Sequence, residues 1–133
     1  MKAINIQITI KSSADTVFSH LTEQDKLMLW FAPQVIAVPS KNTIAAFAFG
    51  SEVNFKMKIT EFEKDKSLEW LCVDGNVNWL NSVVRFSIKE ISKEKTILKF
   101  KHHKLDENEK FDLWKGSWKS YLSQLKIRCE SGK

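Results

Sequence analysis

Several residue types on which common functional motifs depend are scarce in this chain. Its 133 residues include only four glycines, two prolines and two cysteines. The glycines lie far apart, at positions 50, 75, 116 and 132, so no glycine-rich loop is available to cradle a phosphate group. Two cysteines do not make a disulfide framework, and we expect Cys72 and Cys129 to be reduced, inert thiols.

Long apolar runs are also absent, since no stretch approaches the roughly 20 residues that span a bilayer. Near the amino terminus, four isoleucines between Ile4 and Ile10 alternate with polar residues, which is typical of a half-buried strand and not of an export signal. We therefore expect a cytoplasmic protein. With 43% hydrophobic and 28% charged residues, the chain is expected to fold as one soluble domain over residues 1–133.

The positive charge is spread along the chain. A formal net charge of +5 permits an acidic partner such as nucleic acid or an anionic ligand. However, pairs such as Lys56 and Lys58 alternate with apolar residues in a predicted strand, which indicates the solvated face of a sheet. We therefore do not expect nucleic-acid binding.

Two short helices are predicted after the first strand. Ser12 or Ser13 is a candidate N-cap for the first helix. Thr22 and Asp25 are expected to cap the second, and Pro33 ends it because a proline ring disfavours helical geometry in the preceding residue.

From residue 34 onward the hydrophobic period changes to two, which predicts an antiparallel meander. The candidate strands span residues 34–38, 43–49, 52–62, 67–74, 79–91 and 95–103. A long helix from about Asp106 to Cys129 closes the chain, with one apolar stripe formed by Trp114, Trp118, Tyr121, Leu122, Leu125 and Cys129.

The alternation of side chains places one apolar set on a single face of this sheet. The set includes Phe47, Phe49, Phe55, Met57, Trp70, Cys72, Phe86, Phe100 and His102. Because the last helix needs a large apolar partner, we predict an α+β fold of the order β-α-α-β6-α. In this fold a curved seven-stranded antiparallel sheet wraps around the last helix, with space for a cavity between them.

Several strings of the sequence resemble a known family. They are "IKSSADTVFSHLTEQDKLMLWFAP", "SLEWLC", "SVVRFSIKEISKEKTILKFKHHKL" and "GSWKSYLSQLK". Together they resemble the bacterial AHSA1-like branch, related to the activator of Hsp90 ATPase, of the START-like, or SRPBCC, superfamily with its Bet v 1-like helix-grip fold. Two features depart from this family's pattern: "NTIAAFAFG" lacks the usual paired glycines, and Ser117 splits the usual Gly-Trp pair.

The resemblance implies a range of functions, because this fold hosts binding proteins, lipid carriers and some cyclases. An alternative is a protein-interaction module that uses the lysine-rich surface or an outer apolar patch, with a chaperone of the stress response as one candidate partner. Eukaryotic cochaperones of the group carry a separate chaperone-binding domain for which this chain has no room, so the resemblance alone does not imply stimulation of Hsp90.

We predict that a cavity between the sheet and the last helix binds a small apolar or amphipathic molecule. The candidate ligand-binding residues are Trp30, Phe47, Phe49, Phe55, Met57, Trp70, Phe86, His102, Trp118, Tyr121 and Leu122. The same side chains could equally form a solid core. No cofactor is expected.

A cyclase or hydrolase in the same cavity would need an acid or base that faces it. The inward positions include His102 and Tyr121 but no carboxylate, so the pattern favours binding over catalysis and names no catalytic residue. His102 could anchor a polar ligand group or move a proton, but we favour a histidine hydrogen-bonded to a neighbour. His20 and His103 lie elsewhere, so we expect no metal site.

Two features have two interpretations each. Leu71, Val73, Trp79 and Val83 fall on the predicted solvent face. Either a bulge shifts the register there, or they form an apolar patch through which the protein dimerises. Gly116 either allows a close approach of the last helix to the sheet or a ligand, or is a defect that costs the helix about 1 kcal/mol relative to alanine.

Overall fold

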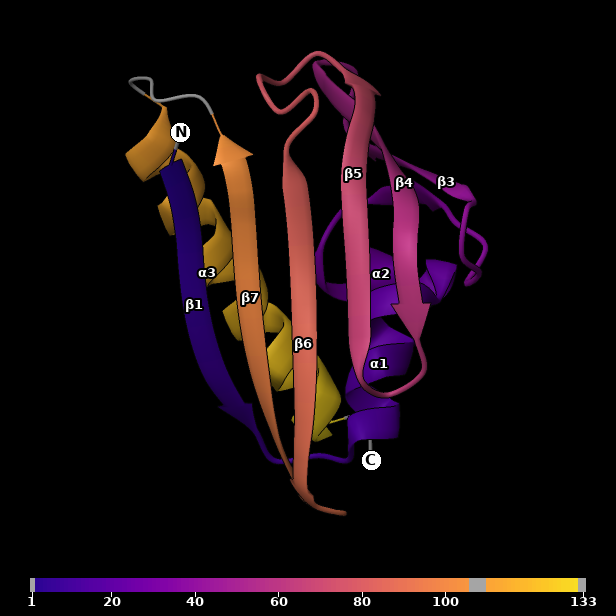
Figure 1. Ribbon diagram of the computed structural model, residues 1–133, viewed down its shortest axis with the longest axis vertical. Coiled ribbons are helices and arrows are strands. Elements are labelled where there is room, and N and C mark those ends of the chain that lie inside the picture. Colours follow the sequence, from indigo (N-terminus) through magenta and orange to yellow (C-terminus); the bar gives the residue numbers. More distant parts are fainter. Residues whose placement is uncertain (1, 106–109, 132–133) are drawn as a thin grey trace.

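Seven strands form one antiparallel sheet that curves around the long helix at the end of the chain (Figure 1). The structure is a computed structural model that describes residues 2–105 and 110–131. Its elements are β1 (Lys2–Ile10), α1 (Ala14–Thr22), α2 (Gln24–Trp30), β2 (Gln34–Ile36), β3 (Ile44–Phe49), β4 (Val53–Glu63), β5 (Ser67–Gly75), β6 (Val83–Ser92), β7 (Lys95–Leu105) and α3 (Phe111–Ser131). The predicted α+β architecture is confirmed.

The strand order is β1-β7-β6-β5-β4-β3-β2, so β1 and β2 are the two edges of the sheet. Helix α3 lies behind β1, β7 and β6, while α1 and α2 lie behind β5 and β4 (Figure 1). All three helices therefore cover the concave face and leave the other face uncovered.

The core lies between the concave face and α3. The sheet contributes inward side chains that are almost fully buried, among them Phe47, Met57, Trp70, Phe86, Leu98 and Phe100. Helix α3 contributes Trp114, Trp118, Leu122, Leu125 and Cys129. Since full burial of one large apolar side chain stabilises a fold by roughly 1.5–3 kcal/mol, this layer is the main source of stability.

The first helix is capped as expected, but the second is not. Ser13 Oγ accepts a hydrogen bond from the Thr16 amide at 3.2 Å, which makes Ser13 the N-cap of α1. The predicted cap at Thr22 is wrong, because Thr22 belongs to α1 and its hydroxyl donates to the Phe18 carbonyl at 2.9 Å. Glu23 stands at the N-cap of α2 and makes no side-chain capping bond.

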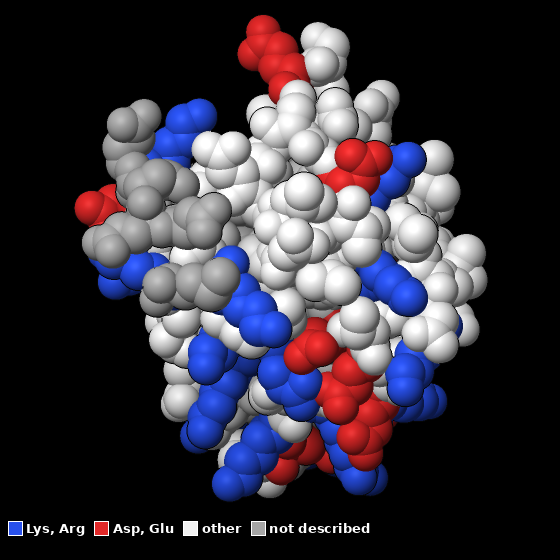
Figure 2. Space-filling model, turned by 45° about the horizontal axis from the view of Figure 1, so that its top comes forward, with Lys and Arg blue, Asp and Glu red and all other residues white. Residues whose placement is uncertain are grey.

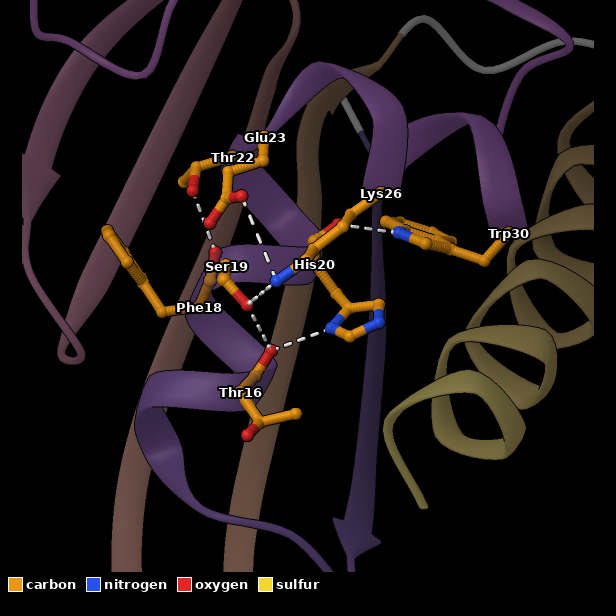
Figure 3. A network of polar contacts seen from close by, with 8 residues as sticks. All are labelled: Thr16, Phe18, Ser19, His20, Thr22, Glu23, Lys26 and Trp30. Carbon is orange, nitrogen blue, oxygen red and sulfur yellow. Dashed lines mark hydrogen bonds and ion pairs between the residues drawn. The ribbon is translucent and has the colours of Figure 1, made fainter. Parts of the chain in front are cut away.

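A network of polar contacts joins α1 to α2 (Figure 3). Lys26 Nζ donates to Ser19 Oγ at 3.1 Å, and Trp30 Nε1 donates to the backbone carbonyl of His20 at 2.7 Å. These bonds fix the end of α2 against α1. They thereby place Phe31, the next residue after α2, against α3 and the sheet.

The predicted strand over residues 79–91 begins four residues later, at Val83. Residues 79–82 form a turn instead, in which the Ser82 amide donates to the Trp79 carbonyl at 2.8 Å and Asn81 has a left-handed φ of 68°. The turn brings Trp79 into the core, although the strand prediction had placed it on the solvent face.

The other boundaries lie close to their predicted positions. Strand β2 ends at Ile36 and not at residue 38, and β7 extends to Leu105. The last helix begins at Phe111. Of its predicted first residues, 106–109 lie outside the described part of the chain and Lys110 lies in a turn.

Strand β5 carries a bulge at Val73. Lys56 pairs with Asp74 and the next residue of β4, Met57, pairs with Cys72, so Val73 is an extra residue in β5. A bulge is therefore present, but the inward position of Trp79 comes from the turn at residues 79–82 and not from this bulge. The predicted four-residue outer patch is wrong, because Trp79 lies in the core.

Immediately after this bulge, Gly75 lies opposite Phe55 of β4. Its φ is +141°, and a Cβ atom there would lie 2.6 Å from the Phe55 Cβ. Only glycine allows this close approach of the two strands. It leaves the Phe55 ring free to face the interior near one end of α3.

Candidate binding cavity at the start of the last helix

Trp118 fills the centre of the interior. Its side chain is 1% exposed and stacks on Phe31 on one side, with ring centroids 5.3 Å apart and planes at 14°. Trp79 stacks on it at 5.9 Å and 17°, and Phe100 packs against it at 4.5 Å. Around Trp118 the interior is therefore a packed core.

His102 on β7 is bonded on both sides within this core. Trp118 Nε1–H donates to His102 Nδ1 at 3.1 Å, and His102 Nε2 lies 2.9 Å from Ser82 Oγ. An indole nitrogen can only donate, so Nδ1 must be the unprotonated nitrogen. The proton of the neutral ring is therefore on Nε2, which donates to the Ser82 hydroxyl.

Burial also keeps His102 neutral. Its side chain is fully buried, and this loss of solvation, with a smaller contribution from the charge of His103, lowers the pKa of His102 to about 3. The arrangement matches the interpretation of His102 as a histidine hydrogen-bonded to its neighbours. Neither ring nitrogen is left over for a ligand.

A cavity of about 320 Å³ lies beside this core, at the start of α3. Its wall is mostly aromatic and consists of Phe31, Phe49, Val53, Phe55, Val77, Trp79, Lys110, Leu113, Trp114, Ser117 and Tyr121. Strands β3 and β4, the loop before β6 and the first turns of α3 all contribute. The ligand-sized space of the interior is thus at one end of the helix and not at Trp118.

A more polar chamber of about 270 Å³ adjoins this cavity. The two share Val53, Val77, Lys110 and Trp114, and the outer chamber adds Glu52, Asn76 and Asn78. Figure 2 shows the molecule from the side of the β5–β6 connection, where uncharged residues dominate and charged residues gather further down. The apolar inner cavity and the polar outer chamber therefore share part of their walls.

Several of the side chains that line the inner cavity can hydrogen-bond to a ligand, among them Tyr121, Ser117 and Trp79. The Tyr121 side chain is half-buried, and burial raises the pKa of its hydroxyl, so it stays protonated at neutral pH. Ser117 adds a second hydroxyl. The indole N–H of Trp79 is buried and has no hydrogen-bond partner among the described residues.

Comparison with known proteins identifies the family. Residues 11–130 match the sequence model of the family described as "Activator of Hsp90 ATPase homolog 1-like protein". The chain belongs to this AHSA1-like family. A search of curated proteins finds no significant match.

Solved structures share the fold of this AHSA1-like chain. The solution structure of the Aha1 dimer from Colwellia psychrerythraea has a TM-score of 0.88 and 24% identity, over 100% of this chain and 99% of that one. A protein from Staphylococcus saprophyticus has a TM-score of 0.79 and 14% identity, over 98% and 93% of the two chains. A protein from Mesorhizobium loti has the same TM-score and identity over 95% of each chain. The helix-grip fold is that of ligand-binding or interaction modules in general.

The structure separates the predicted site residues of this AHSA1-like chain into three groups. Phe49, Phe55 and Tyr121 line the inner cavity. Trp30, Met57, Trp70, Phe86, His102, Trp118 and Leu122 are buried and line neither this cavity nor its outer chamber. Phe47 lines a different groove, described below.

Sequence reasoning missed Phe31, Trp79 and Trp114 as cavity residues. Trp114 lies on the predicted apolar stripe of the last helix, and this position indicates a side chain that faces the interior. Phe31 directly follows α2, where no periodicity indicates its direction. Trp79 was assigned to the wrong face because its turn was taken as part of a strand.

A second groove, of about 590 Å³, lies between α2 and the β2 edge of the sheet. Its lining residues are Gln24, Met28, Gln34, Val35, Ile36, Ala46, Phe47, Ala48, Asn54, Phe55 and Lys56. Several apolar side chains are exposed around it, among them Met28, Ile36, Val38 and Ile44. The groove is mostly apolar and shares only Phe55 with the lining of the inner cavity.

The two cysteines are residues of the protein interior. Cys72 and Cys129 are free and buried, and burial raises the pKa of both thiols, that of Cys129 to about 12. Within residues 2–105 and 110–131, no three or more His, Cys, Asp or Glu side chains gather as metal ligands would. None of the described helices is long and apolar enough to cross a membrane.

Proposed function

We propose that the protein binds a small apolar or amphipathic molecule in the inner cavity, without changing it chemically. The observation that carries this proposal is the aromatic cavity of about 320 Å³ beside a core that is otherwise closely packed. Ligand sites in proteins are typically concave spaces of roughly 300–1,000 Å³, mostly apolar, with a few polar groups. The inner cavity has this composition and is at the small end of this range.

The adjoining chamber supports an amphipathic ligand in particular. An apolar group would be buried among Phe49, Phe55 and Trp114, while a polar group would reach the outer chamber near Asn78. Tyr121 and Ser117 supply hydroxyl groups on the wall of the inner cavity. His102 is not used, because both of its nitrogens bond within the core.

Location is a further part of the proposal. Both cysteines are free thiols, which supports a cytoplasmic protein, where thiols remain reduced. A lipid or another small metabolite of the cytoplasm would then be the natural ligand class.

A filled cavity tests the proposal. Ser117 lines the cavity and Ser120 is exposed on the same helix, so Ser117→Phe fills the space while Ser120→Phe adds the same ring to the surface. We expect Ser117→Phe to weaken binding of the neutral probe N-phenyl-1-naphthylamine at least tenfold in fluorescence titrations, and Ser120→Phe to leave it unchanged. Equal affinities in both variants would contradict a site in this cavity, and native mass spectrometry of freshly purified protein would detect a retained ligand.

We also propose that the protein forms a homodimer through the β2 edge of the sheet. Ile36, Val38 and Ile44 there are 70%, 58% and 54% exposed, and Met28 adds to the same surface. An open edge strand beside exposed apolar side chains is well suited to isologous pairing with a second copy. The similar protein from Colwellia psychrerythraea was solved as a dimer.

The oligomeric state of matched variants tests this interface. Ile36→Lys places a charge in the proposed contact, while Ile127→Lys places one at a 54% exposed isoleucine on α3. We expect light scattering to give a dimer mass for the natural protein and for Ile127→Lys, and a monomer mass for Ile36→Lys. A natural protein that stays monomeric at high concentration would refute the dimer.

A further inference from the structure

The buried N–H of Trp79 indicates what chemical group the cavity receives. Trp79 is 8% exposed and lines the inner cavity, and its Nε1 has no hydrogen-bond partner among the described residues. Buried polar groups are nearly always paired, because an unpaired donor has lost its hydrogen bonds to water without replacing them. A donor of this kind beside a cavity calls for an acceptor from outside the chain.

We propose that the molecule bound in the inner cavity carries an oxygen acceptor, such as a carbonyl or carboxylate, that accepts a hydrogen bond from Trp79 Nε1–H. This inference rests on the proposed function, since it names one chemical group of the molecule bound there. An indole nitrogen donates a hydrogen bond and does not accept one. A hydroxyl on the ligand would therefore have to accept through its oxygen, and an N–H or O–H proton of the ligand could not pair with Trp79 Nε1.

The rings that pack against Trp79 do not supply an acceptor for its N–H, so a ligand could supply one. Phe55, Trp114 and Trp118 surround Trp79 with aromatic rings and offer no oxygen. His102 packs against Trp79 with ring centroids 4.8 Å apart, but its Nδ1 already accepts from Trp118. None of these four ring neighbours therefore offers an unused acceptor to the Trp79 N–H.

The position of Trp79 also sets where the acceptor lies. Trp79 lines the inner cavity but not the outer polar chamber. The acceptor is therefore within the apolar part of the ligand and is separate from any polar end that reaches Asn78. Ketones, esters and acids attached directly to a ring system have this arrangement, whereas a plain hydrocarbon does not.

A pair of probes with the same shape tests this inference. 2-Acetylnaphthalene carries a carbonyl acceptor, and 2-isopropylnaphthalene replaces it with a methyl branch. Relative to the natural protein, Trp79→Phe should shift the ratio of the two dissociation constants about fivefold against the ketone, the effect of one ordinary hydrogen bond. Trp114→Phe removes an indole from the same wall, and we expect it to weaken both probes alike and leave the ratio unchanged.

The natural protein provides a second measurement, which holds even if Trp79→Phe fails to fold. In ¹H–¹⁵N NMR spectra the assigned Trp79 indole N–H signal should move downfield with the ketone and not with the hydrocarbon. If both probes bind with an unchanged signal and an unchanged ratio in Trp79→Phe, the acceptor is refuted while the cavity remains a binding site. If neither probe binds, the proposed function fails with it.

Discussion

Trp118 and Trp79 are stacked indoles in one interior, yet their polar ends are in opposite situations. The Trp118 N–H donates to His102, which in turn bonds to Ser82, so this donor belongs to a closed internal chain. The Trp79 N–H is buried and has no such partner among the described residues, and the Trp79 side chain lines the inner cavity. Two similar side chains, 5.9 Å apart, thus mark the boundary between a packed core and a cavity.

The difference separates the part of the interior that stabilises the fold from the part to which we assign the proposed binding. A satisfied polar group in a packed core favours one arrangement of its neighbours. An unsatisfied group at a cavity costs stability in the free protein, and a ligand can restore that loss on binding. The two roles are separable by mutation because they belong to different residues.

The largest effect on stability is expected from a substitution in the packed core around Trp118. Trp118→Ala removes the central ring and should lower the free energy of unfolding by about 3–5 kcal/mol, because a cavity replaces its contacts. Leu113→Ala, at a 64% exposed position of the same helix, should change it by less than about 0.5 kcal/mol. Urea denaturation measures both, and a loss below 1 kcal/mol for Trp118→Ala would mean that this core is loosely packed.

Acid should destabilise the protein through the hydrogen-bonded series of Trp118, His102 and Ser82. The pKa of His102 is about 3 in the folded protein against 6.5 ordinarily, so between these values the unfolded chain binds a proton that the folded chain does not. Stability is therefore complete above pH 6.5 and falls as the pH drops toward 3. From pH 7.5 to pH 5 we expect a loss of about 2 kcal/mol in the free energy of unfolding.

His102→Gln is the control for this acid effect, since glutamine does not titrate. In urea titrations at several pH values, most of the loss between pH 7.5 and pH 5 should disappear in this variant. An unchanged pH dependence would assign the effect to other groups, such as His103, whose pKa is also lowered, chiefly by burial.

A matched pair of phenylalanine substitutions compares the two indoles directly. Trp118→Phe leaves His102 Nδ1 as a buried acceptor without its donor, whereas Trp79→Phe removes a donor that had no partner. Beyond the similar loss of ring area, we expect Trp118→Phe to cost about 1–2 kcal/mol more than Trp79→Phe. Thermal and urea unfolding of both variants give this difference, and equal costs would mean that the two N–H groups are equivalent.

The smallest effect is expected from the helix that carries Trp114 and Trp118. A Cβ added at Gly116 would meet nothing within 4 Å, so the close-approach interpretation of this glycine is wrong and the helix-defect interpretation is correct. Gly116→Ala should raise the free energy of unfolding by up to about 1 kcal/mol and leave probe binding unchanged. A lower stability would show that the helix needs a flexible point there.

Much of the fold could be predicted from the sequence, since each strand repeats a period of two and α3 repeats an apolar stripe. The error at residues 79–91 has a local cause. The residues "NWLNS" continue the alternation of the following strand, and only the left-handed backbone at Asn81 turns Trp79 inward. The failure of Thr22 as a cap is similar, because its hydroxyl bonds back to Phe18 within α1.

The site was less predictable than the fold. The period of a strand says which side chains face inward, but not which of them meet without a gap. Phe49 and Tyr121 border the cavity while Trp70 and Trp118 do not. This difference depends on side-chain conformations at the start of α3. The pairing of His102 with Trp118 joins residues from two distant elements, for which the sequence holds no local signal.

The two buried thiols have a practical consequence for labelling. Thiol reagents attack the thiolate, and burial keeps both Cys72 and Cys129 protonated and covered. A cysteine introduced at the exposed rim position Leu113 would therefore react selectively with a maleimide dye, with no need to remove the natural cysteines first. Such a conjugate would test the proposed binding from the wall of the inner cavity.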